Sequence, residues 1–362
     1  MRNARPGLAV APSMTDRAFR LSVLDLVPVR SDQSTSDALA ATVALARTAD
    51  DLGFTRYWLA EHHNMRAVAA TNPPVLMALV GSATSRIRVG SGGVMLPNHA
   101  PLVVAEQLAL LEAAFPGRVD LGIGRAPGSD PVTSHLLRRG VRPDDGVDAF
   151  PDDVATVAGL LAPGGVSLAL GSQRYDLAAT PRATTEPTIW LLGSSMYSAQ
   201  LAAANGLPYV FANHFGGGGT LEALAAYRSQ FRPSEHLAEP RTIGVVNAVV
   251  AETTEEARRL ALPQARSMWR LRSGGPLAPQ ELVEDAEAAP LAPADQAAAD
   301  RLAQTWIVGS PDEAAARVRA VADELRTDEV MVAPVAGAHT GTPATSSPAR
   351  EETLRLLAAA LL

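Results

Sequence analysis

Short aliphatic runs alternate with stretches of helical periodicity along most of the chain. Strands of a buried parallel sheet read as continuous apolar runs, and the helices that join them carry one apolar stripe. The pattern predicts eight strands, in chain order Leu21–Leu24, Tyr57–Ala60, Ile87–Met95, Val119–Ile123, Thr188–Leu192, Tyr209–Ala212, Ile243–Val250 and Glu329–Ala333. Repeated βα units of this kind favour an α/β fold, specifically a (β/α)8 TIM barrel. A doubly wound open sheet shares the alternation, but no Gly-x-Gly-x-x-Gly follows the first predicted strand.

Local signals mark the starts of several helices. Ser36 is predicted to cap the first helix, because Ser at this position accepts a hydrogen bond from a free amide of the first turn. Thr253 and Glu256 are predicted to form a capping box, as are Ser310 and Glu313.

The same pattern divides the chain into segments. Residues 1–18 are predicted to be a disordered N-terminal extension, with Met14 as an alternative start of translation. Residues 19–335 are predicted to form the barrel, and 336–362 a linker and a C-terminal helix. Residues 272–304 are rich in Pro, Ala and acidic side chains, so they are interpreted as an insertion between the seventh strand and the last helix.

Composition narrows the class of function. The formal net charge is −7, and the 31 basic residues are scattered, so no basic stripe indicates a nucleic-acid partner. No apolar run approaches the roughly 20 residues that cross a bilayer, so no membrane partner is predicted. The chain has no cysteine, which excludes disulfides, thiolate metal sites and a cysteine nucleophile. A cytoplasmic location is the expectation that fits these features.

A histidine-containing segment, Glu61-His62-His63-Asn64, directly follows the second predicted strand. The active site of an α/β barrel lies at the carboxyl ends of its strands, so this position favours function. Neighbouring side chains of an extended segment point to opposite sides, so one imidazole at most is expected to face the barrel mouth. Adjacent histidines lack the spacing of a helical zinc pair, and no metal site is predicted. A structural histidine and a proton-carrying histidine both fit the local pattern.

Two other strand ends carry candidate binding residues. Gly92 and Gly93 interrupt the third predicted strand, and adjacent glycines in a strand indicate either a bulge or close approach of a ligand. Arg125 follows the fourth strand, where its guanidinium offers a fork for a phosphate or a partner for a carboxylate.

Three serines follow the fifth strand and open a helix: Ser194, Ser195 and Ser198. Free amides and hydroxyls at a helix N-terminus bind anions, although Ser is also a common helix cap. Phosphate sites in barrels more often follow strands seven and eight. Glycines, an arginine and serines on one rim together indicate a flat cofactor that carries a phosphate.

Four segments resemble bacterial luciferase-like monooxygenases: Trp58–Asn64, Gly90–Pro97, Gly122–Arg125 and Gly193–Ala203. The resemblance covers roughly residues 19–335, and the order of the four motifs is specific. It implies a flavin-dependent oxidoreductase with a TIM-barrel fold and FMN as the cofactor.

The resemblance also assigns roles to individual positions. It implies that His62 is the catalytic histidine, a proton carrier beside the flavin. It implies a non-proline cis peptide at Gly92-Gly93 beneath the isoalloxazine ring. Arg125, Ser195 and Ser198 match the positions that hold the FMN phosphate, and Ser194 stands beside them where luciferase itself has an acidic residue.

The resemblance further implies an FMN-dependent monooxygenase that uses reduced flavin (FMNH2) and O2 on an organic substrate. The expected partners are a separate NAD(P)H:flavin reductase and a second copy of the chain in a homodimer.

The reactive cysteine of luciferase has no counterpart in this chain, so light emission is not implied. Two alternatives stay open: a deazaflavin-dependent hydride-transfer oxidoreductase and a non-catalytic flavin-binding protein. The identity of the substrate is not readable, because residues 272–304 match the family poorly.

Overall fold

The computed structural model describes residues 19–126, 128–138, 148–212, 218–275 and 277–362, and the predicted disorder of residues 1–18 lies outside them. The strands are β1 (Arg20–Asp25), β2 (Arg56–Leu59), β3 (Arg88–Ser91), β4 (Val94–Met95), β5 (Val119–Gly124), β6 (Val166–Leu170), β7 (Gln173–Leu177), β8 (Thr188–Gly193), β9 (Tyr209–Phe211), β10 (Gly244–Val250), β11 (Ile307–Gly309) and β12 (Glu329–Pro334). The helices are α1 (Thr35–Asp51), α2 (Pro73–Ala83), α3 (Pro101–Ala114), α4 (Pro131–Arg138), α5 (Phe150–Leu161), α6 (Met196–Ala204), α7 (Thr220–Gln230), α8 (Thr254–Arg272), α9 (Val283–Ala288), α10 (Pro293–Ala303), α11 (Pro311–Leu325) and α12 (Pro348–Leu361), with a 3₁₀ turn at Leu96–Asn98.

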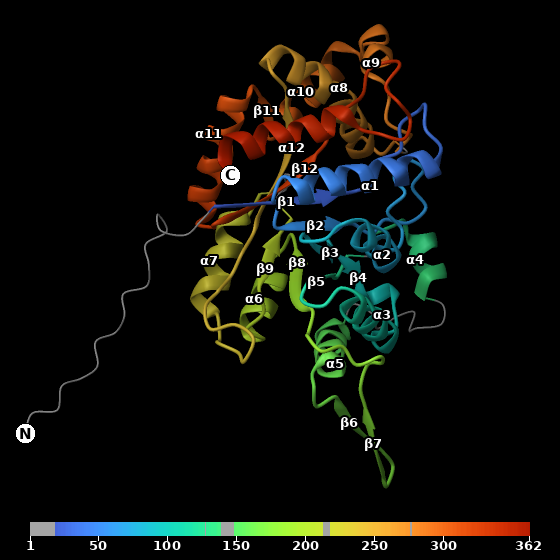
Figure 1. Ribbon diagram of the computed structural model, residues 1–362, viewed down its shortest axis with the longest axis vertical. Coiled ribbons are helices and arrows are strands. Elements are labelled where there is room, and N and C mark those ends of the chain that lie inside the picture. The colour runs from blue at the N-terminus through green and yellow to red at the C-terminus, as the bar shows by residue number, and fades with distance from the viewer. Residues whose placement is uncertain (1–18, 127, 139–147, 213–217, 276) are drawn as a thin grey trace, which may run out of the picture.

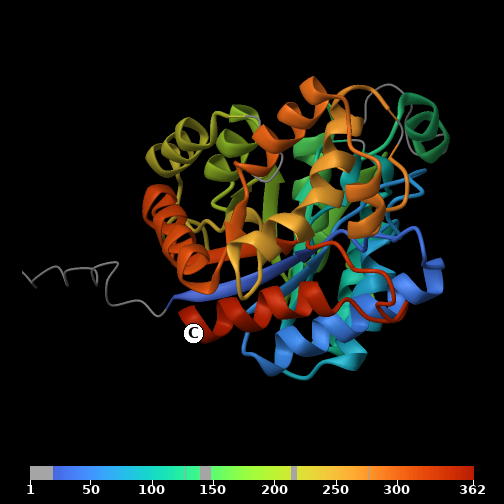
Figure 2. The same ribbon diagram turned by 90° about the horizontal axis from the view of Figure 1, so that it is seen from above.

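One parallel sheet forms the centre of the molecule. Its strands lie in the order β11-β10-β12-β1-β2-β3-β5-β8-β9, and β4 pairs with β5 beside this path. A parallel bridge between Tyr209 and Thr242 joins the start of β9 to the residues just before β10. Helices surround the sheet, with α1 and α12 side by side, while the antiparallel hairpin of β6 and β7 projects from the body (Figures 1 and 2). The predicted α/β class with a parallel sheet is confirmed.

Alternation along the strands separates an inner from an outer core. Along β12, Val330 and Val332 pack in the large cluster beneath the helices. Met331 and Ala333 belong instead to a smaller inner cluster that also contains Trp58. Side chains of a strand point to opposite faces in turn, so only this inner set faces the space enclosed by the sheet.

A buried ionic network fills the amino-terminal end of that space. Arg56 Nη1 lies 2.6 Å from Asp120 Oδ2, and Arg56 Nε lies 2.6 Å from Glu329 Oε1. Arg88 donates to the other oxygen of Asp120 at 2.7 Å. Trp58 Nε1 donates to Asp120 Oδ2 at 3.0 Å. The network therefore also fixes the indole ring of Trp58, which lies closer to the carboxyl ends of the strands than Arg56 does. Burial raises the pKa of Asp120, but Arg56 and Arg88 outweigh burial and lower it.

The first helix begins two residues earlier than predicted. Ser34 is its N-cap, with an extended backbone and a hydroxyl that accepts from the amide of Asp37. The carboxylate of Asp37 accepts from the Ser34 amide in return at 2.9 Å, which completes a capping box. Ser36 lies inside the helix, so the predicted cap at Ser36 is wrong, because the reciprocal pair satisfies two free amides where a lone serine satisfies one.

Of the two predicted capping boxes, one forms only in part. Thr253 accepts from the amide of Glu256, as predicted. The Glu256 carboxylate does not return to Thr253, because it lies 2.6 Å from His339 Nε2 and is engaged there. Ser310 and Glu313 form the second capping box as predicted.

One predicted strand needs correction, and the predicted insertion gains detail. The single strand expected over Ile87–Met95 is divided into β3 and β4, because the chain turns at Gly92-Gly93. The insertion at residues 272–304 contains two helices, α9 and α10, and is followed by β11, which pairs with β10 and was not predicted. Three residues are too few to stand out as a strand in the sequence. None of the helices in the described ranges is long and apolar enough to cross a bilayer.

Candidate active site

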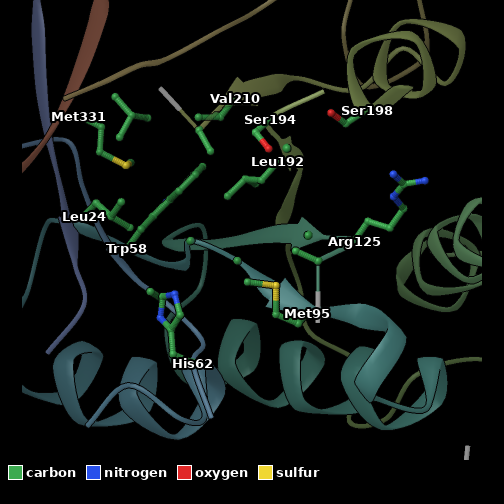
Figure 3. A pocket seen from close by; sticks show the side chains of 18 of the residues that line it. Leu24, Trp58, His62, Met95, Arg125, Leu192, Ser194, Ser198, Val210 and Met331 are labelled. Atoms are coloured by element: carbon green, nitrogen blue, oxygen red, sulfur yellow. The ribbon is translucent and has the colours of Figure 1, made fainter. Parts of the chain in front are cut away.

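A cavity of about 240 Å³ opens at the carboxyl ends of the strands. It is lined by residues that end or follow β1, β2, β3, β5, β8 and β9, so one space collects side chains from across the sheet. All the site residues predicted from the sequence line it: His62, Gly92, Gly93, Arg125, Ser194, Ser195 and Ser198. Figure 3 shows His62 and Trp58 at one end of this pocket and Arg125 and Ser198 toward the other.

The floor of the pocket is main chain. The peptide bond between Gly92 and Gly93 is cis, as the resemblance implied. A Cβ atom on Gly92 would lie 2.6 Å from Leu24 Cδ1, and one on Gly93 would lie 2.7 Å from the carbonyl oxygen of Gly122. Neither position accepts a side chain without movement of its neighbours. The glycines therefore leave a flat surface beside the inner face of β5.

His62 lines the pocket beside this floor. Its backbone amide donates to the carbonyl of Ala70 at 2.7 Å, which holds the segment after β2 in place. Its Nδ1 is buried and has no hydrogen-bond partner among the described residues. Burial lowers the pKa of His62 below its ordinary value of 6.5, and the nearby Glu61 carboxylate opposes this only in part. At neutral pH the imidazole is therefore uncharged and able to accept a proton.

Glu61 lies behind the pocket wall and was not predicted as a functional residue. Its Oε1 lies 2.8 Å from Nε2 of both His63 and His99, and its Oε2 accepts from the amide of Met95 at 3.0 Å. Burial would raise the pKa of Glu61, but the hydrogen bonds from His63 and His99 outweigh it and hold the pKa at about 2. The ionised carboxylate thus ties the segment that contains His62 to β4, the strand that directly follows the glycine floor.

Arg125 lies at the opposite end with its charge available. Its guanidinium stacks on the ring of Tyr197, 4.3 Å from the centroid. It forms no ion pair with a carboxylate within the described part of the chain. Of the two roles that the sequence left open for Arg125, the structure therefore does not support that of a carboxylate partner. A stacked guanidinium keeps its donors free in a fixed plane, which suits bidentate contact with a phosphate.

The start of α6 supplies further donors beside Arg125. Ser195 is the N-cap residue, but its hydroxyl makes no capping hydrogen bond, so the ordinary capping role is not fulfilled. Ser194 is exposed at the pocket edge. Ser198 is buried, and its hydroxyl donates to the Ser195 carbonyl at 2.8 Å and lies 3.1 Å from the hydroxyl of Tyr209. Within the described ranges, the hydroxyls of Ser194 and Ser195 therefore have no partner, whereas the Ser198 hydroxyl is already engaged.

Several lining residues have no counterpart among the predicted site residues. Trp58, Leu24, Met95 and Met331 form apolar walls around the glycine floor. Leu24, Trp58 and Met331 belong to the inner cluster of the strands, and strand alternation would have selected them once the register was known. Tyr197, which orients Arg125, lay inside the quoted Gly193–Ala203 motif but was not singled out.

Comparisons with known proteins identify the family. The chain belongs to the luciferase-like monooxygenases, since residues 19–328 match that family. It is 38% identical to a luciferase-like monooxygenase of Escherichia coli strain K12, over 88% of this chain and 92% of the relative. It is 35% identical to an N-acetyl-S-alkylcysteine monooxygenase of Bacillus subtilis strain 168, over 67% of this chain and 70% of the relative. The predicted family is confirmed, and the chain is a flavin-dependent oxidoreductase.

Solved structures agree with this membership. The structure of apo-MsnO8 superposes with a TM-score of 0.82 at 32% identity, covering 95% of this chain and 99% of that chain. The oxygenating constituent of 3,6-diketocamphane monooxygenase from Pseudomonas putida, solved with FMN, gives 0.67 at 18% identity, covering 95% and 98%. An F420-dependent secondary alcohol dehydrogenase gives 0.62 at 16% identity, covering 94% and 99%. The last two likenesses show a common fold and no more.

Proposed function

We propose that this chain is an FMN-dependent monooxygenase that uses reduced FMN and O2 on an organic substrate. The observation that carries the proposal is one pocket that joins a glycine floor, the His62 imidazole and the Arg125 guanidinium, which has no carboxylate partner among the described residues. A tricyclic ring with a phosphorylated side chain needs a flat apolar surface at one end and an anion site at the other. This pocket supplies both.

The anion end would hold the FMN phosphate. Arg125 contributes a full positive charge whose orientation is fixed by Tyr197. The free hydroxyls of Ser194 and Ser195 and the first amides of α6 add neutral donors, and a helix N-terminus favours a negative group. Ser198 supports this end indirectly, because its hydroxyl holds the Ser195 carbonyl.

The floor end would hold the ring. Gly92 and Gly93 allow close approach of a flat molecule, while Trp58 and Leu24 exclude water from its edge. Bound reduced flavin supplies the electrons and the reactivity toward oxygen. His62 lines this end of the pocket, and its lowered pKa leaves the imidazole uncharged and able to take up a proton.

The pattern of surface residues supports the expected homodimer. Val75 and Leu79 on α2 and Val103 and Leu110 on α3 are exposed apolar side chains on two helices that pack against each other. Exposed apolar side chains that gather on neighbouring helices mark an interaction site. We take a second copy of the chain as its partner. A separate NAD(P)H:flavin reductase and a cytoplasmic location stay predictions.

The finer fold prediction also belongs to this proposal. If the Tyr209–Thr242 bridge is counted as the closing contact, then β1, β2, β3, β5, β8, β9, β10 and β12 make a (β/α)8 barrel. The β11 strand then pairs with β10 outside the ring.

Cofactor binding under anaerobic conditions tests the proposal. We expect reduced FMN to bind more tightly than riboflavin, and coenzyme F420, a deazaflavin, to bind weakly. Stopped-flow mixing of the reduced FMN complex with oxygen should then give reoxidation kinetics that differ from those of free FMN. Binding of the deazaflavin alone would support hydride transfer without oxygen. Reoxidation identical to that of free flavin would support a flavin-binding protein without catalysis.

A further inference from the structure

A second cavity of about 310 Å³ adjoins the first. The two share Leu24, Leu26 and His62, so the imidazole lies where they meet. The second cavity lies beneath α8 and the segment after it, between the ends of β10 and β12 and the segments that follow β1 and β2. It is therefore a separate space that reaches the same histidine from the other side.

The wall of the second cavity is mostly apolar. Besides Leu24 and Leu26, its larger apolar side chains include Met65, Val68, Met268, Leu271, Leu277 and Val335. Two of these are methionines, whose flexible side chains adapt to ligands of different shape.

The polar groups on this wall are largely paired with each other. Arg350 lines the cavity, but its Nη2 lies 2.6 Å from the Asp25 carboxylate and its Nε donates to the Pro334 carbonyl at 2.8 Å. Gln280 donates to Gln264 at 3.1 Å. Among the described lining residues there is no carboxylate and no cation that lacks a partner.

From this geometry we infer that the second cavity is the substrate site and that it takes an uncharged, predominantly apolar organic molecule. The inference rests on the proposed function, which places the flavin in the first cavity. An ionised ligand would lose its hydration here without gaining a free counter-charge, which disfavours its binding. An apolar ligand loses nothing comparable and gains burial against the aliphatic wall.

The position of His62 determines how a substrate is oriented in the second cavity. A molecule in the second cavity meets the pocket of the proposed flavin at the imidazole, so its reacting group is the part nearest to His62. The part of the molecule remote from His62 contacts α8, whose Ser267 and Met268 line the cavity. These α8 residues therefore determine which length and width of substrate fits.

A matched pair of probes tests the charge preference. N-phenyl-1-naphthylamine and 1-anilinonaphthalene-8-sulfonate share one ring system and differ by a sulfonate. Equilibrium dialysis against the full chain, with and without saturating FMN, should show saturable binding of the neutral probe under both conditions. The sulfonate should bind at least about tenfold more weakly. Equal binding of the two probes, or displacement of the neutral probe by FMN, would overturn the inference.

Two serine substitutions locate the probe. Ser267→Phe adds a ring inside the cavity and should weaken binding of the neutral probe by at least about fivefold. Ser229→Phe makes the same change at an exposed position of α7 and should leave probe binding unchanged. Retained FMN binding in both variants shows that they are folded. Unchanged probe binding in Ser267→Phe would place the probe elsewhere and refute the inference.

The outcome for the proposed function is read separately. Failure of the wild-type chain to bind FMN would reject the proposed flavin pocket, whatever the probes do. Normal FMN binding with no saturable binding of the neutral probe would reject only the substrate inference.

Discussion

The two ends of the central sheet treat buried polar groups in opposite ways. At the amino ends, Arg56, Asp120 and Glu329 satisfy one another at 2.6 Å. At the carboxyl ends, His62 Nδ1 has no partner among the described residues, and Arg125 has only a ring beneath it. Paired charges hold strands in register, whereas unpaired donors and acceptors are available to a ligand. The contrast separates the part of the fold that maintains structure from the part that performs chemistry.

The largest effect is expected at the amino ends, in the variant Glu329→Ala. Glu329 accepts from Ser22 at 2.7 Å and from Arg56 at 2.6 Å, so its removal leaves a buried guanidinium with one fewer carboxylate. We expect a loss of about 3–5 kcal/mol in the free energy of unfolding. Urea denaturation measures it, and Glu324→Ala at an exposed position of α11 serves as the control. A loss comparable to that of the control would contradict a structural role for the network.

At the carboxyl ends, His62→Ala should change chemistry and leave folding intact. We expect reoxidation of the reduced FMN complex by oxygen to slow by about 10²-fold or more, with FMN affinity within about threefold of wild type. Since burial lowers the pKa of His62, the wild-type rate should hold as pH falls to 6.5 and decline only below it. Stopped-flow absorbance measures both, with His236→Ala, an exposed histidine, as the control. Loss of FMN binding would mean that the histidine holds the cofactor.

Arg125→Ala sharpens the contrast at the phosphate end. We expect FMN affinity to fall by about 10–100-fold, because a charged hydrogen-bonding group contributes about 1.5–3 kcal/mol. Riboflavin, which has no phosphate, should bind as it does to wild type. Fluorescence titration compares the two ligands, and Arg66→Ala at an exposed position is the matched control. Equal weakening of both ligands would refute the phosphate assignment.

The smallest effect concerns a half-buried cluster of His339, Glu256 and Glu284, which lies outside both ends of the sheet. His339 lies 2.6 Å from both Glu256 and Glu284, and although burial would lower its pKa, the two carboxylates raise it. A raised pKa means that the cluster stabilises the fold fully below pH 6.5 and loses this contribution as pH rises through the raised value. The difference in unfolding free energy between wild type and His339→Gln should therefore shrink at alkaline pH, and should not exceed about 1 kcal/mol. A difference that grows with pH would reverse the assignment.

Local patterns predicted those features that depend on neighbours in sequence. Continuous apolar runs located the strands, and the residues directly after them located His62, Arg125 and the α6 serines in one pocket. The reciprocal pair of Ser34 and Asp37 shows how a nearby competitor displaces a plausible cap.

Features that depend on residues far apart were not predicted. His99 reaches Glu61 across 38 positions, and no local pattern links the two. Trp58 donates to Asp120, 62 positions away in the sequence, and this hydrogen bond fixes a wall of the pocket. The second cavity depends on how α8 and the segment after it pack over the strand ends. Such packing is decided by tertiary contacts and leaves no periodic signal in the chain.

The glycine floor has a consequence for how this scaffold diversifies. A side chain at Gly93 would meet the carbonyl oxygen of Gly122, so substitution at Gly93 cannot reshape this part of the floor without moving main chain. The wall of the second cavity is open to change, because α8 presents replaceable side chains such as Ser267 and Met268 there. A mutant library aimed at altered substrate range is best confined to that helix, with the floor left untouched.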